Sequence, residues 1–183
     1  MTTKQSEPET PLERFKTMYI PLYRVLLVLG FLSVIVSLPG VLNIRQILDF
    51  INTDPYYAAS GLVSVFIVLP LMISSLFLLA QKHPTGIQLR LGGYAASIIA
   101  AILGLFTSRE TILTLTRDTV ETTARSNAGI SHELALQITE ITYSTLLYIS
   151  IAIALLFAWL WWTAWKKQMK ADAKKSKKDN ATN

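Results

Sequence analysis

The charged residues of this chain leave four long stretches that carry no charge at all. These stretches hold 20, 27, 18 and 25 residues and occupy positions 25–44, 55–81, 91–108 and 141–165. An apolar run of about 18 or more residues is long enough to cross a bilayer core of roughly 30 Å. Four such runs exclude a soluble globular protein and a disordered chain, and they predict four transmembrane helices.

The predicted fold is therefore all-α: a polytopic membrane protein in which four transmembrane helices form an antiparallel bundle. We expect one transmembrane domain over residues 21–165. Asp54 and Pro55 give the second span a helix cap followed by a proline at the first helical position. Pro70, deep inside that span, predicts a kink, which can mark a hinge or a site but is also common in structural spans. The spans are expected at about 21–38, 55–80, 89–106 and 143–165.

The basic residues predict the orientation. Of 17 lysines and arginines, 13 fall in the N-terminal segment, around the turn between spans two and three, or in the C-terminal tail. The positive-inside rule then places both termini in the cytoplasm, and we expect the protein in the plasma (inner) membrane. A cleaved signal peptide in the first span is disfavoured, because residues 37–40 lack a small-x-small cleavage site.

Shorter elements are expected at the edges of the bundle. Residues 1–10 are polar and predicted to be disordered in the cytoplasm. Residues 10–13 form a capping box, which predicts that an amphipathic helix starts there and covers residues 11–20 on the cytoplasmic face. Residues 43–52 place four apolar side chains on one helical face, which favours an interfacial helix, with a gate or a docking surface as the alternative.

The third span carries the most regular pattern in the chain. Gly92, Ala96, Ala100 and Gly104 recur at four-residue spacing. Small residues at this spacing let two membrane helices approach closely. This row predicts a helix-packing surface, either inside the bundle or against a second copy or another membrane-protein subunit.

Residues 107–142 are too polar to span and predict an extracytoplasmic helical hairpin. Its first arm carries Arg117, Glu121 and Arg125 at i, i+4 spacing, and its second arm carries Leu134 and Ile138 on one face. Such a polar helix pair is marginal in water by itself, which makes these five residues candidates for an extracytoplasmic interaction.

Residues 166–183 form a basic cytoplasmic tail. Clusters of lysine directly after a span attract anionic lipid head groups. The tail therefore predicts contact with membrane lipids and not with nucleic acid. The residues expected to make this contact are Lys166, Lys167, Lys170, Lys174 and Lys175.

Reactive groups are scarce. The chain has no cysteine, and its two histidines, His83 and His132, are expected on opposite sides of the membrane. No motif for a catalytic residue, a metal or a cofactor is present, and no Asp, Glu, Lys or His falls within the expected spans. Proton-coupled transporters usually keep a carboxylate at membrane depth, so its absence from the expected spans argues against proton-coupled transport.

Arg24 lies about one turn into the first span, and its long side chain is expected to reach the lipid head groups.

These observations predict a non-catalytic protein, an accessory, assembly or scaffolding subunit of a larger membrane complex. The alternative is a small transporter or channel for lipids or hydrophobic molecules. That alternative predicts a continuous cavity bordered by Pro70 and the glycines of the third span. No motif points to a specific family.

Overall fold

The computed structural model describes residues 15, 18–41, 44–116 and 132–182. Every regular element in these ranges is a helix, which confirms the predicted all-α class for them, and residues 109–116 are helical too. In chain order the named helices are α2 (Pro21–Val41), α3 (Ile44–Asp49), α4 (Pro55–Val63), the π-helical turn η1 (Ser64–Val68), α5 (Leu69–Ala80), α6 (Pro84–Gly104) and α8 (His132–Thr182).

Three helices are long and apolar enough to cross a membrane. They are the continuous helix Pro55–Ala80, built from α4, η1 and α5, then α6, and the segment Leu136–Lys177 of α8. The described apolar part of α2, Pro21–Ile35, is shorter. These lengths support a membrane-embedded helical protein and account for three of the four predicted spans.

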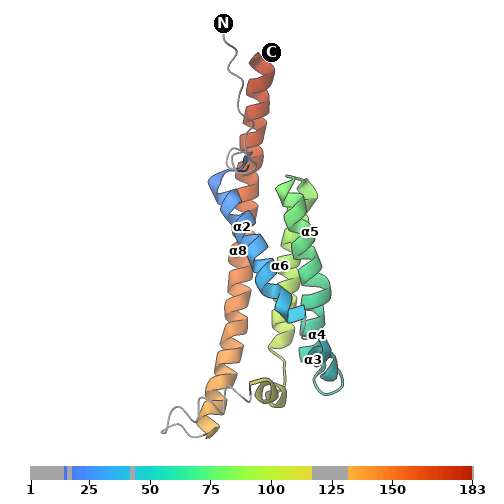
Figure 1. Ribbon diagram of the computed structural model, residues 1–183. Helices are drawn as coiled ribbons and strands as arrows, with labels where there is room; N and C mark the ends of the chain where they lie inside the picture. Colours follow the sequence, from blue (N-terminus) through green and yellow to red (C-terminus); the bar gives the residue numbers. More distant parts are fainter. Residues whose placement is uncertain (1–14, 16–17, 42–43, 117–131, 183) are drawn as a thin grey trace.

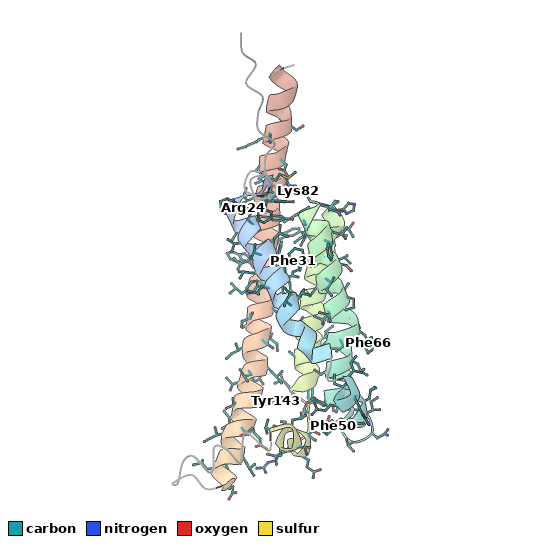
Figure 2. The ribbon with its side chains drawn as sticks, in the orientation of Figure 1. Arg24, Phe31, Phe50, Phe66, Lys82 and Tyr143 are labelled. Carbon is teal, nitrogen blue, oxygen red and sulfur yellow. The ribbon has the colours of Figure 1, made fainter. Side chains whose placement is uncertain are left out.

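The helices alternate in direction (Figure 1). The start of α2, the turn between α5 and α6 and the C-terminal part of α8 lie at one end, whereas α3 and residues 109–116 lie at the other. Figure 1 also shows α2 crossing obliquely in front of α6, between α8 and α5. Arg24 and Lys82 mark the first end, and Phe50 and Tyr143 mark the second (Figure 2).

Helix α8 is much longer than a bilayer requires. Its 51 residues correspond to about 76 Å at 1.5 Å per residue, against a hydrocarbon core of about 30 Å. It therefore continues past its apolar segment at both ends. The basic tail, which the sequence characterises only by its charge, is helical as far as Thr182.

Other predicted segments are covered only in part. The short helix α3 lies within the range 43–52. Most of the expected amphipathic helix at 11–20 lies outside the described residues. Of the expected hairpin, residues 107–116 and the start of α8 are described, and Arg109 forms an ion pair there with Glu140.

A glycine allows α5 and α6 to pack in very close contact. Gly86 is buried in the first turn of α6. A Cβ atom at this position would lie 2.8 Å from the backbone nitrogen of Leu79 and 3.0 Å from the carbonyl carbon of Leu78. Since backbone atoms cannot rotate away as a side chain can, only glycine fits this contact.

A polar cluster joins the start of α2 and the α5–α6 turn to α8. Gln168 is buried, and its Oε1 accepts a hydrogen bond from the Ile20 backbone N–H at 2.7 Å. Its Nε2 donates to the Met18 carbonyl at 3.1 Å. One turn later, Asp172 pairs with Lys82 at 2.9 Å. These contacts hold the bundle together at the end where α2 starts.

At the opposite end, Asp54 joins α4 to the segment after α6. Its carboxylate caps α4 by accepting the Tyr57 backbone N–H at 3.0 Å, and it accepts the Ser108 backbone N–H at 2.7 Å. Burial disfavours the charged form, but hydrogen bonds from the two amides and from the Thr111 and Ser108 side chains together outweigh it and lower the pKa of Asp54 below its ordinary value.

We therefore expect Asp54→Ala to destabilise the protein by about 2 kcal/mol, because two backbone amides lose the charged acceptor that the buried Asp54 supplies. Thermal unfolding in detergent measures this change, and Asp49→Ala, at an exposed aspartate on α3, is the matched control. A lowered folded pKa means that the contribution is complete above the unfolded pKa of about 3.9 and is lost as the pH falls below it. The difference between wild type and Asp54→Asn should therefore shrink towards pH 3; an unchanged difference would contradict this assignment.

Candidate functional site

A cavity of about 710 Å³ lies between the helices. Its volume falls within the range of about 300 to 1,000 Å³ that is typical of pockets for small molecules. Most lining side chains are apolar, and they come from α2, α3, α4, η1, α5, α6 and α8. The lining residues that define its chemistry and its opening are Leu29, Gly30, Leu32, Arg90, Ser97 and Trp161.

A local widening of the second long helix forms one wall. In η1 the Leu69 N–H donates to the Ser64 carbonyl, five residues earlier, and Pro70 follows directly without an N–H of its own. The residues of this wall that line the cavity are Ser64, Val65, Val68 and Leu69. Pro70 and the glycines of the third span do not line it, so the border predicted from the sequence is wrong. The sequence predicts a kink at Pro70; the structure has a π-helical turn just before it, and such turns are frequent at functional sites.

A second glycine brings α2 close to Arg90, an arginine in the cavity wall. A Cβ atom on Gly30 would lie 2.5 Å from the Leu76 side chain and 3.3 Å from Nη2 of Arg90. Gly30 therefore lets the backbone of α2 pass directly beside the guanidinium group.

Arg90 is the most unusual group in the site. It lies seven residues into α6 and is only 3% exposed. Its guanidinium lies 5.1 Å from the ring centre of Tyr94 and 5.2 Å from that of Trp161, and its Nη1 is 3.5 Å from the Met72 carbonyl. Its Nε has no hydrogen-bond partner among the described residues, nor does the structure pair the guanidinium with any described carboxylate.

Trp161 of α8 offers a second unused donor. Its side chain is fully buried, and its indole Nε1 has no hydrogen-bond partner in the described part of the chain. Arg90 and Trp161 both line the cavity. Their donor atoms are covered and lie next to the Tyr94 side chain, so the wall offers a ligand mainly the charge of Arg90, which no described carboxylate pairs. Such a wall suits a ligand that brings oxygen acceptors.

The cavity also reaches the outer surface of the bundle. Leu29 and Leu32 line it, yet they are 42% and 54% exposed. A hydrophobic molecule can therefore reach the cavity from this side of the bundle.

The small residues of the third span separate into two groups. Ala96, Ala100 and Gly104 are buried, and Ala100 accepts a hydrogen bond at its carbonyl from the Ser60 hydroxyl at 2.8 Å. Gly92 faces open space, because a Cβ atom added there would meet nothing within 4 Å. Contacts within the chain therefore occupy three of the four positions.

The other residues singled out from the sequence lie away from the cavity. Leu134 and Ile138 are exposed on the first turns of α8, whereas Arg117, Glu121 and Arg125 lie outside the described residues. The ammonium group of Lys166 lies 4.7 Å from the ring centre of Trp162. The remaining candidate lysines for lipid contact are exposed on α8: Lys167, Lys170, Lys174 and Lys175.

The sequence pattern places Arg90 among the charges at the edge of the third span and does not identify it as a site residue. The signal that could have found it is the helix start: His83 caps α6, accepting the Thr85 N–H at 3.3 Å, and Pro84 occupies the first turn. Counted from Pro84, Arg90 lies about 9 Å along the helix. At that depth the structure places its side chain between α2, α5 and α8.

Within the described ranges, no group of three His, Cys, Asp or Glu residues is placed to hold a metal ion. The site thus combines apolar walls, one cation and hydrogen-bond donors, an arrangement suited to binding. Comparison with protein-family models, curated proteins and solved structures finds no match for this chain.

Proposed function

We propose that this chain is a non-catalytic integral membrane protein that binds a lipid or another hydrophobic small molecule in the cavity between its helices, as a small transporter or carrier. The observation that carries this proposal is the apolar cavity of about 710 Å³, which opens beside the exposed side chains of Leu29 and Leu32. A tightly packed bundle would offer such a molecule no site.

The proposed arrangement is a four-helix transmembrane bundle, with α2 as the remaining span and both termini in the cytoplasm. The support comes from the direction of the helices: the start of α2, the α5–α6 turn and the end of α8 share one end of the molecule (Figure 1). That end carries the lysine-rich part of α8, as the positive-inside rule requires of a cytoplasmic face. An extracytoplasmic helical hairpin over 107–142 remains part of the proposal.

Photo-crosslinking tests the binding proposal. A long-chain alcohol with a diazirine in its chain, added to the full-length protein in vesicles, should label cavity residues such as Val68 and Phe157. Ser97→Trp fills the cavity from α6, so we expect that labelling to fall at least about fivefold. Ala95→Trp, at an exposed position of the same helix, is the matched control.

Label confined to exposed, lipid-facing residues such as Phe66, and equal in both tryptophan variants, would contradict the binding proposal. Phe66 also serves as an internal standard, because it is 62% exposed and does not line the cavity. Its labelling should stay constant in all variants.

An accessory or scaffolding role in a larger membrane complex remains a prediction. The small-residue row supports it less than the sequence suggests, because three of its members already pack inside the chain. Co-purification in mild detergent with a stoichiometric partner, or with a second copy of the chain, would support this role.

A further inference from the structure

The buried guanidinium of Arg90 indicates the chemistry of the ligand, and this inference rests on the proposed binding function. Transfer of an ion from water to a buried site costs several kcal/mol unless the ion is paired. Arginine keeps its charge in proteins, so it cannot avoid this cost by losing a proton. Arg90 needs an anion, and the two aromatic rings beside it compensate only in part.

The described carboxylates are engaged elsewhere or exposed. Asp172 pairs with Lys82, Glu140 pairs with Arg109, and Asp54 accepts two backbone amides at the end near α3. None of them lines the cavity. Three further carboxylates, whose side chains the structure also describes, are exposed: Asp49, Glu110 and Glu133.

We propose that the ligand is an acyl-chain amphiphile with an anionic head group, a carboxylate or a phosphate, which binds Arg90. The head-group oxygens accept hydrogen bonds from the guanidinium and from the indole N–H of Trp161. Both residues line the cavity, but the donor atoms Nε and Nε1 are themselves covered, so the head group binds after a small shift of these two side chains. Arginine binds planar or tetrahedral oxyanions through two parallel hydrogen bonds, which adds specificity to the charge.

The rest of the cavity identifies the ligand as an amphiphile and not as a small soluble anion. Away from Arg90 the walls are mainly apolar side chains, aliphatic in α2 and η1 and partly aromatic in α8, which stabilise an acyl chain by burying its surface. The lateral opening at Leu29 and Leu32 faces lipid, where such a molecule resides. A free phosphate ion would leave these walls without a partner.

The test compares dissociation constants of oleate, oleyl alcohol and inorganic phosphate for the purified, delipidated full chain, at alkaline pH where the carboxylate is ionised. We expect oleate to bind about tenfold to a hundredfold more tightly than oleyl alcohol, the range for hydrogen bonds to a charged group. Arg90→Met should abolish this preference without abolishing binding of the alcohol. Arg90→Lys should restore part of it, because lysine keeps the charge but not the paired donors.

Two further variants keep the result interpretable. Trp161→Phe keeps an aromatic ring and removes only the N–H, and it should weaken oleate binding about threefold to tenfold. Arg24→Met makes the same substitution at an arginine that does not line the cavity and should leave both affinities unchanged. If Arg90→Met fails to fold, Arg90→Lys and Trp161→Phe decide the question.

The outcomes separate this inference from the proposed function. Binding of neither oleate nor oleyl alcohol would overturn both. Equal affinities for the two, unaffected at Arg90, would overturn the anionic ligand alone and leave a site for neutral lipids. Displacement of oleate by millimolar inorganic phosphate would show a site for soluble anions and would overturn the amphiphile.

Discussion

Gly86→Ala is expected to destabilise the protein by about 3 kcal/mol, and Gly86→Leu to prevent folding altogether, since overpacking against a fixed backbone is not relieved by side-chain movement. The alanine Cβ would lie 2.8 Å from the backbone nitrogen of Leu79, and α5 and α6 would have to move apart. Because α6 also carries Arg90, separation of these helices would disrupt the cavity as well.

The matched control for Gly86 is Gly92→Ala in the same helix. A Cβ atom at Gly92 meets nothing within 4 Å. Alanine there should be neutral or should stabilise by up to about 1 kcal/mol, because glycine in a helix interior loses more conformational entropy on folding. Melting temperatures and the yield of monodisperse protein in detergent measure both changes. Equal effects at the two glycines would contradict the close α5–α6 contact.

The long helices could be predicted because charge is excluded from the bilayer core. The uncharged stretches 55–81, 91–108 and 141–165 each fall largely within one apolar helix of the structure. Helix ends are set by different physics. A helix starts where a cap satisfies its first amides. His83 and Pro84 start α6 six residues before Arg90, the charged residue that precedes the uncharged stretch 91–108.

The cavity could not be predicted from the sequence, because it depends on how the helices pack against one another. Residue spacing shows which residues share one helical face, but not which neighbouring face they meet. Arg90 from α6, Gly30 from α2 and Trp161 from α8 come together only in the folded bundle, where α2 and α8 both pass beside the guanidinium. The small-residue row illustrates the point: its spacing predicts close packing, but not whether the partner lies inside the chain or outside it.

Arg90→Met is expected to raise the stability of the delipidated protein by about 1 to 3 kcal/mol, because replacement of a buried, incompletely paired charge by an apolar side chain removes its desolvation cost. Loss of the ring contacts with Tyr94 and Trp161 offsets part of this gain. A residue that stabilises the fold would behave in the opposite way. Gain of stability on removal is typical of groups retained for binding.

The central claim, that Arg90 is the anchor for an anionic amphiphile, is tested most directly by the melting temperatures of wild type and Arg90→Met, each delipidated and each with saturating oleate. We predict that Arg90→Met melts higher without oleate and that oleate reverses the order, because a ligand stabilises the folded state that binds it, and more so the tighter it binds. If the variant instead melts lower without oleate, and oleate shifts both proteins equally, Arg90 is a structural residue and the account is contradicted.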